Sequence, residues 1–377
     1  MTIALIGFNK ILYMPYINFY LSGIDVCANE VHVIYWIRDN NPDIDLPKQI
    51  TLHGFHRCIK DTVPLIKKAK DIISFGRFAK KELKRINPDL LIVMHSTTAI
   101  SFYRFLKNKY KGRYIFDYRD ITYENICFYK KMVNQIITNS KLSFTSSDGF
   151  RFLLPDSAKL MTSHNVNFSS FIHREEFRKK RETDSRHVPI RIAFWGLLRH
   201  TKLNRAVVDR IGGDKRFELY YYGRAQGAML DLMKEMTAKY NNVFYLGEYD
   251  YNKREQFAIN VDLLHNLYLN DTKTEPFAMG NKYYDGIGYY IPQLCTKGSY
   301  MGEMCVKHGV GIEIDPFSED ICEKIYSYYM DYDQSAFLSN CDIEYHRIAN
   351  EVSNGIEQIK NALDTTNDVK KDKSERP

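Results

Sequence analysis

The sequence predicts an α/β protein of two Rossmann-like domains that face a central cleft, followed by a helical C-terminal segment. Short apolar runs alternate with helix-length amphipathic segments, which is typical of a parallel sheet covered by helices on both faces. This alternation occurs twice, over residues 2–146 and again over residues 190–314. A chain of 377 residues also suits two domains better than one.

Each half of the chain contains short apolar runs that we interpret as buried strands. In the first half these runs are residues 2–6, 31–36, 50–53, 90–94, 114–117 and 142–146. In the second half they are residues 190–195, 217–222, 243–246, 263–269, 293–296 and 311–314. Between them, segments such as 97–110 and 228–240 carry apolar residues at helical spacing and are expected to be the connecting helices.

A densely charged segment separates the two halves. Residues 171–189 contain few aliphatic side chains and include Pro189, so we expect an exposed linker there. The N-terminal domain would then span residues 1–170, and the C-terminal domain residues 190–345. A helix over 346–364 is expected to return to the N-terminal domain, and the polar tail 365–377 to be disordered.

Composition excludes several classes of protein. With 44% apolar and 26% charged residues the chain is globular, and no stretch approaches the ~18 apolar residues of a membrane-spanning helix. The N-terminal residues lack the features of a secretory signal. Seven cysteines without a C-x-x-C pair indicate free thiols and a cytoplasmic setting. The net charge of +7 favours anionic partners, but no nucleic-acid recognition motif accompanies it.

Ligands of open parallel sheets bind beyond the carboxyl ends of the strands, and the most informative such segment is 275–294. Gly280 and Asn281 predict a helix start with Asn281 as the N-cap. Free N–H groups there, together with the charge of Lys282, suit a phosphate. Asp285 lies on the same helical face and could accept hydrogen bonds from two ribose hydroxyls. The alternative is an ordinary capped helix that binds no ligand.

A second candidate segment follows the apolar run 190–195. Gly196 ends that run, and Arg199 and Lys202 come shortly after it. Backbone amides and two cations at the end of a strand can hold a diphosphate, and Gly223 stands at the end of the next strand. The spacing is not that of a P-loop. The alternative is a turn with solvated basic side chains.

Together these segments resemble the GT-B glycosyltransferases of the large family 4, or group 1, retaining type. The resemblance runs in order through about residues 1–315. In the second half it is carried by a glycine-and-lysine loop at 196–202 and by an N-K-x-x-D donor motif, followed by Gly and Ile-Pro, at 281–292. In the first half it is carried by a strand with a D-x-R-D turn at 114–120, a further strand and turn at 144–150, and a His-Asn pair at 164–165.

The resemblance implies a hexosyltransferase that moves a sugar, with retention, from a nucleotide-diphosphate sugar to a saccharide or lipid-linked saccharide. It implies no metal or other cofactor, and a role in bacterial capsule, lipopolysaccharide or exopolysaccharide assembly. Lys202 and Arg199 would neutralise the leaving diphosphate. Donor contacts would come from these positions: Gly196, Gly223, Glu275, Asn281, Lys282 and Asp285.

The sequence departs from the family pattern at three positions. The arginine of the family's glycine loop is replaced by Leu197, and its ribose-binding glutamate by Asp285. Phe277 stands where the family has the glutamate that contacts the donor sugar, and the nearest acidic residue is Glu275. Two other interpretations therefore stay open: a GT-B-fold sugar-nucleotide epimerase, and a non-catalytic carbohydrate-binding or scaffold protein.

Two residues of the N-terminal half are candidates for the acceptor side. His95 follows the strand 90–94 and resembles a histidine often found there in the family, where a neutral imidazole could orient a sugar. Asp120 could position the acceptor or act as a base. The alternatives are a structural histidine, and for Asp120 a salt bridge with Arg119 or a turn cap.

The segment 66–86 combines basic residues with an apolar component at Ile72, Ile73, Phe75, Phe78 and Leu83. A basic amphipathic helix can lie on an anionic membrane surface, so the protein is a candidate peripheral protein of the inner membrane face. The alternative is a solvated helix packed on the sheet.

Overall fold

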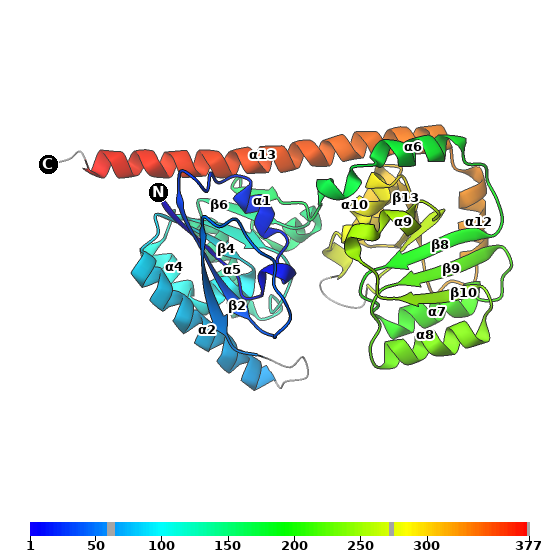
Figure 1. Cartoon of the computed structure of the whole chain (residues 1–377), viewed down its shortest axis with the longest axis horizontal. Coiled ribbons are helices and arrows are strands. Elements are labelled where there is room, and N and C mark those ends of the chain that lie inside the picture. Colours follow the sequence, from blue (N-terminus) through cyan, green and yellow to red (C-terminus); the bar gives the residue numbers. More distant parts are fainter. Residues whose placement is uncertain (59–64, 271–274, 375–377) are drawn as a thin grey trace. The chain divides into compact units, whose positions relative to one another are not determined.

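A computed structural model describes residues 1–58, 65–270 and 275–374, with their side chains except at 65–69, 275 and 367–374. The chain divides into two units, Met1–His164 with Asn350–Pro377, and Asn165–Ala349. Each unit has a parallel sheet flanked by helices (Figure 1). The predicted α/β fold class with two Rossmann-like domains is therefore confirmed.

In the first unit the described residues form a seven-stranded sheet of order β3-β2-β1-β4-β5-β6-β7. Its strands are β1 (Thr2–Ile6), β2 (Glu30–Ile37), β3 (Ile50–His56), β4 (Leu90–Met94), β5 (Tyr114–Tyr118), β6 (Leu142–Thr145) and β7 (Leu160–Thr162). Its helices are η1 (Ile11–Tyr13), α1 (Ile17–Leu21), α2 (Leu65–Ile86), α3 (Ser96–Ser101), α4 (Tyr103–Lys109), α5 (Cys127–Asn139) and η2 (Asp148–Leu153). In the central pairing, Ile3 lies opposite Val31 on one side and Leu90 on the other.

In the second unit the described residues form a six-stranded sheet of order β10-β9-β8-β11-β12-β13. Its strands are β8 (Ile190–Trp195), β9 (Phe217–Tyr222), β10 (Val243–Gly247), β11 (Leu263–Asn266), β12 (Gln293–Thr296) and β13 (Gly311–Ile314). Its helices are η3 (Phe168–Phe171), α6 (Arg174–Thr183), α7 (Thr201–Ile211), α8 (Ala228–Lys239), η4 (Tyr251–Lys253), α9 (Glu255–Ala258), η5 (Glu275–Phe277), α10 (Asn281–Gly288), α11 (Tyr300–Lys307) and α12 (Ile321–Asp331). The last helix, α13 (Gln334–Ser374), begins in this unit.

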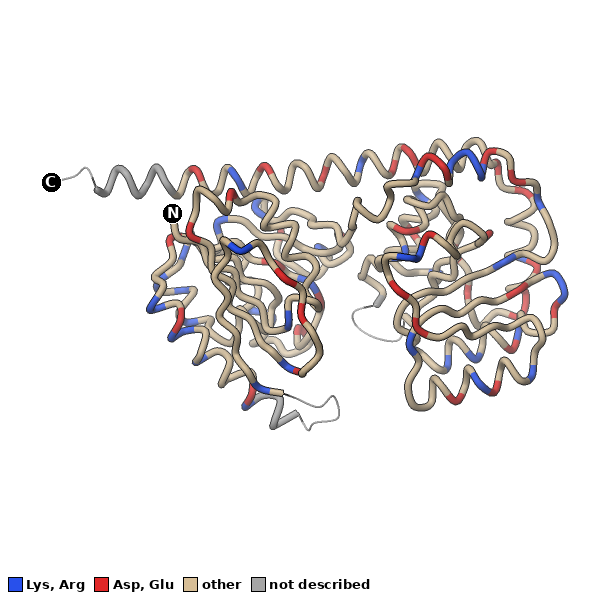
Figure 2. Tube along the Cα trace, in the orientation of Figure 1, with Lys and Arg blue, Asp and Glu red and all other residues tan. Residues whose placement is uncertain are grey.

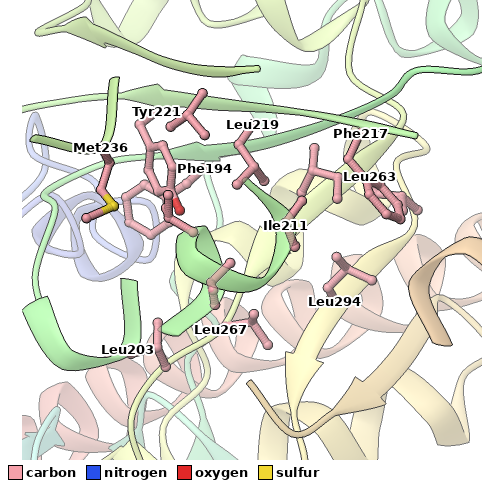
Figure 3. Close-up of a cluster of buried hydrophobic side chains, with 14 of the residues drawn as sticks. Phe194, Leu203, Ile211, Phe217, Leu219, Tyr221, Met236, Leu263, Leu267 and Leu294 are labelled. Atoms are coloured by element: carbon pink, nitrogen blue, oxygen red, sulfur yellow. The ribbon is translucent and has the colours of Figure 1, made fainter. Parts of the chain in front are cut away.

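The core of the second unit lies between its sheet and the helices α7, α8 and α12. Figure 3 labels Phe217, Leu219 and Tyr221 of β9 together with Leu203 and Ile211 of α7, and all five belong to one buried cluster. The apolar residues of α7 recur three and four positions apart, so they form one stripe that faces the sheet. Burying this stripe removes apolar surface from water, which is the main source of stability for such a layer.

The segment expected to be an exposed linker is instead helical and partly buried. Helix α6 occupies most of 171–189, and the linker prediction is wrong in this respect. Phe177 packs against Tyr289 at a ring-centroid distance of 4.8 Å, and Arg181 donates to the backbone oxygens of Ala258 and Val261. A few anchoring side chains bury this helix, although most of its residues are charged.

Helix α13 is longer than predicted at both ends. It begins at Gln334 rather than near residue 346, and it continues to Ser374, past the expected end at 364. Its first part contributes Phe337, Leu338 and Cys341 to the buried residues of the second unit. Its later part contributes Ile359, Ala362 and Leu363 to the core of the first unit.

Candidate functional site

Two glycines bring the carboxyl ends of β8 and β9 into direct backbone contact. Gly196 has a φ of 123° and Gly223 a φ of 136°, both outside the range that other residues favour. A Cβ atom on Gly223 would lie 1.7 Å from the carbonyl oxygen of Gly196. The structure therefore brings these two predicted donor-site residues together, and only glycine fits at 223.

Helix α10 begins one residue earlier than its predicted cap implies. Gly280 is the N-cap, and no side chain caps the helix there, so the prediction of Asn281 as the N-cap is wrong. Asn281 is the first helical residue, and its Oδ1 accepts a hydrogen bond of 2.6 Å from Asn165 Nδ2. Without a side-chain cap, the first backbone N–H groups of α10 stay available to an anion.

Lys282 is a buried cation in the first turn of α10. The residue is 6% exposed, and Nζ donates to the Tyr268 hydroxyl at 2.6 Å. The ammonium also lies 4.1 Å from the centroid of the Phe194 ring. Among the described side chains, no carboxylate lies within ion-pair distance of Lys282, although Asp285 is close enough for the two charges to interact. Buried charges are normally paired, so this position calls for an anion.

Tyr268, just beyond β11, links the two predicted segments. Besides binding Lys282, its ring lies edge-on to the ring of His200, the left-handed residue that precedes α7, at 6.3 Å. Its backbone N–H donates to Thr296 Oγ1 at 2.9 Å. The loop after β8 and the start of α10 therefore meet at Tyr268, which no sequence motif singled out.

Strand β11 contains a buried histidine that is close enough to Lys282 to feel its charge. His265 is 1% exposed, and burial lowers its pKa to about 3, with a further contribution from the charge of Lys282. The imidazole is therefore neutral at pH 7 and does not compete with Lys282 for an anion.

Asp285 lies in an internal ion pair rather than on an open surface. It is 4% exposed, and its Oδ2 accepts hydrogen bonds from Trp195 Nε1 at 2.7 Å and Arg254 Nη1 at 2.9 Å. Burial raises the pKa of the Asp285 carboxyl, and Arg254 opposes that rise. The structure thus gives Asp285 a packing role that the sequence did not predict, and its contact with ribose stays a prediction. Removing this carboxylate would leave Arg254 buried without its counter-ion, which is strongly destabilising.

The other predicted cations of this unit are exposed, Arg199 in a loop and Lys202 in the first turn of a helix. Arg199 is exposed after β8, and Arg224, which the sequence analysis did not select, is exposed after β9. Lys202 is exposed at the start of α7, with Nζ 5.4 Å from the centroid of the Phe317 ring. The structure does not place Lys202 in contact with Lys282. The side chain of Glu275 lies outside the described residues.

In the first unit His95 and Asp120 lie close together. His95 Nε2 is 4.0 Å from Asp120 Oδ2, and Nδ1 accepts a hydrogen bond from the backbone N–H of Thr97. Burial lowers the pKa of His95 to about 4, so its imidazole is neutral at pH 7. Arg119 pairs with Asp117 at 2.8 Å, and this ion pair differs from the Arg119–Asp120 bridge considered as an alternative.

Most of the apolar component of α2 packs on the sheet. Phe75 and Leu83 are buried, Phe78 packs on Phe55, and Ile73 is the exposed member at 54%. Basic residues recur along the described part of the helix (Figure 2). The packed-helix alternative thus explains the amphipathic pattern, and a membrane contact stays a prediction based on the basic face. Among the described helices, none has the length and apolarity needed to cross a bilayer.

The two-sheet architecture matches solved structures over nearly the whole chain. Sucrose-phosphate synthase from Thermosynechococcus elongatus matches with a TM-score of 0.70 at 11% identity, over 100% of both chains. HepE from Anabaena, in complex with UDP and glucose, matches with a TM-score of 0.66 at 14% identity, over 97% of this chain and 99% of HepE. WaaG, a glycosyltransferase involved in lipopolysaccharide biosynthesis, matches with a TM-score of 0.59 at 14% identity, over 95% and 99%.

These matches define the class of fold. The chain has the GT-B fold, in which two Rossmann-like domains follow one another, as the resemblance of its motifs predicted. No protein-family model and no curated protein matches the sequence.

Proposed function

We propose that the protein is a glycosyltransferase that takes a sugar from a nucleoside-diphosphate sugar. The reaction breaks the bond between the sugar and the diphosphate and forms a glycosidic bond to an acceptor hydroxyl, whose proton is released. The acceptor is a saccharide or a lipid-linked saccharide, and the configuration at the sugar is retained. The HepE structure of the same fold holds UDP and glucose, which supports a nucleotide-sugar donor.

The observation that carries this proposal is the buried charge of Lys282, which forms no ion pair with a carboxylate among the described side chains. A cation taken out of water is costly unless an anion or several hydrogen bonds compensate it. Tyr268 supplies one hydrogen bond, and the Phe194 ring supplies a cation–π contact. The N-terminus of α10 adds a partial positive charge and free N–H groups at the same place. A diphosphate of the donor would satisfy all three features.

The remaining residues have distinct proposed roles. Gly196 faces open space, where a Cβ atom would meet nothing within 4 Å, so a ligand can approach the end of β8 closely, and Gly223 allows the loop after β9 to contact this backbone. Lys202 and Arg199 would stabilise the charge that grows on the leaving diphosphate, so that no metal is required for that step. In the first unit, neutral His95 and Asp120 would orient the acceptor, and the exposed basic face of α2 would contact an anionic membrane that carries a lipid-linked acceptor.

Calorimetric titration with a panel of nucleoside diphosphates tests this proposal directly. We expect at least one diphosphate to bind the full chain. Lys282→Met, which removes the charge and keeps most of the side-chain volume, should weaken that binding by about tenfold to a hundredfold, the range of a lost hydrogen bond to a charged group. Lys234→Met, an exposed position on α8, is the matched control and should bind as the wild type does.

The outcome for the wild type then separates the alternatives. If none of the diphosphates binds, or if Lys282→Met binds them equally well, the proposed donor site is wrong. With a binding nucleotide sugar in hand, slow release of nucleoside diphosphate indicates a transferase. Interconversion of the sugar indicates an epimerase, and binding without either reaction indicates a carbohydrate-binding protein.

A further inference from the structure

The first unit contains a buried arginine with unused hydrogen-bond donors. Arg119, directly after β5, is 5% exposed, and its Nε donates to Asp117 Oδ2 at 2.8 Å. Its guanidinium lies on the ring of Tyr16, 4.1 Å from the centroid. Nη1 and Nη2 are buried and have no hydrogen-bond partner within the described part of the chain. Buried donors without partners are costly, so these groups require acceptors that the described residues do not supply.

Other buried polar atoms lie near this guanidinium. Among the residues that the structure describes, the hydroxyls of Tyr20 and Ser163 and one oxygen of Asp117 are buried without a hydrogen bond of normal geometry. Asp117 and Ser163 are close enough to the Tyr20 hydroxyl to interact with it, and the charge of Arg119 also acts on Tyr20, so these groups are neighbours. Interactions among Tyr20, Asp117 and Ser163 still leave Nη1 and Nη2 of Arg119 without an acceptor among the described residues. Burial raises the pKa of Tyr20, so the Tyr20 hydroxyl keeps its proton and can donate. The cluster therefore presents more donors than acceptors.

The position of the cluster favours a ligand that carries negative charge. Arg119 follows β5 and Ser163 follows β7, at the carboxyl edge of the sheet where parallel α/β folds bind ligands. The charges of Arg119 and Arg38 both reach His95 at this edge and help to lower its pKa. The Nη1–Nη2 end of a guanidinium matches the paired oxygens of a phosphate or carboxylate.

We propose that Arg119, Tyr20 and Ser163 form a binding site for an oxyanion, either a phosphate or a carboxylate. The group enters beside Tyr16, which is partly exposed and covers the guanidinium. Its residues belong to the first unit of the chain, whereas Lys282 belongs to the second. If the proposed sugar transfer is correct, the oxyanion belongs to the acceptor, which is then a phosphorylated or acidic sugar rather than a neutral one.

The test measures orthophosphate binding by calorimetry at constant ionic strength, with all variants of the full chain made in a Lys282→Met background. This background removes the key cation of the proposed donor site. Tyr20→Phe and Ser163→Ala each delete one hydroxyl and should weaken phosphate binding by about threefold to tenfold. Tyr110→Phe is the matched control. Its hydroxyl is also buried and without a partner among the described residues, but it lies before β5 at the opposite edge.

Equal phosphate affinity in all of these variants, or no phosphate binding, would overturn the proposal and indicate that water fills the cluster. Competition of glucose 6-phosphate, glucuronate and glucose against orthophosphate then identifies the source of the oxyanion. Displacement by the first indicates a phosphate and displacement by the second a carboxylate, whereas equal displacement by glucose contradicts a site for charge. Nucleoside diphosphate binding to the wild type is a separate readout, so either proposal can fail while the other stands.

Discussion

His95 combines a strained backbone with a neutral side chain. Its φ of 77° is rare for a residue with a Cβ atom, and such conformations concentrate at functional sites. The residue is 8% exposed, and its imidazole accepts a hydrogen bond from the N–H of Thr97, which fixes the start of α3. The sequence predicted a neutral histidine at the end of a strand, but it did not indicate the capping role, which depends on local backbone geometry.

The low pKa of His95 makes stability depend on pH in a defined direction. In the unfolded chain its pKa is near 6.5, and in the folded protein it is about 4. Between these values the unfolded chain binds a proton that the folded protein does not, so stability falls as pH decreases from 6.5 to 4. The full difference corresponds to roughly 3 kcal/mol. His95→Asn keeps a residue that tolerates positive φ and can cap α3, and it should flatten urea-unfolding free energies across this window.

His173 provides the control for this measurement. A hydrogen bond to Glu255 raises the pKa of His173, so its contribution is present at low pH and is lost as pH rises through the folded value. His173→Asn should therefore change the pH profile in the opposite direction. If the wild type and His95→Asn give parallel profiles between pH 6.5 and 4, the neutral burial of His95 is refuted.

At the scale of elements, the apolar runs predicted the strands of both sheets, whereas the sequence did not predict the polar contacts between elements. All of the predicted strands exist, because continuous apolar runs are required in strands buried on both faces. Strand β7 was missed, since it has three residues and includes a threonine. The ion pair between Arg254 and Asp285 joins positions 31 residues apart, and Tyr268 carries no motif among 28 tyrosines. Such contacts depend on the topology, which brings distant strand ends together.

The contact between the loops after β8 and β9 predicts a large difference between two glycine substitutions. Gly112→Ala introduces a side chain at a φ of 72° with no atom within 4 Å, so it should cost about 1–2 kcal/mol of strain. Gly223→Ala adds a collision with the Gly196 carbonyl and should cost at least about 3 kcal/mol. Urea-unfolding free energies of both variants check this. Equal losses would show that the two loops can separate without strain.

At the scale of the whole molecule, helix α13 contributes to both hydrophobic cores. Phe337 and Leu338 are buried in the second unit, and Ile359 is buried in the first. The helical pattern predicted a helix near the C-terminus, and we expected residues 346–364 to return to the N-terminal domain. The pattern did not predict the length, because the exposed face of the helix carries polar residues that resemble a solvated tail.

Two isoleucines of α13 test how much the helix stabilises the first unit. Ile359 is fully buried against Gly23, whereas Ile343 is 63% exposed. Ile359→Ala should destabilise the protein by about 2–5 kcal/mol, and Ile343→Ala by no more than about 0.5 kcal/mol. Thermal and urea unfolding of both variants provide the comparison. Similar values for the two would mean that the later part of α13 is not part of the first core.

Because α13 contributes to both units, it also determines the order in which the two units can complete their hydrophobic cores during synthesis. Residues 165–349 emerge from the ribosome before Ile359, Ala362 and Leu363, which the earlier half needs to close its interior. At 5–20 residues per second, the N-terminal sheet waits roughly 10 to 40 s with an apolar face exposed. The half that is translated second therefore completes its core first, and the N-terminal half is the one whose core stays incompletely covered for longer.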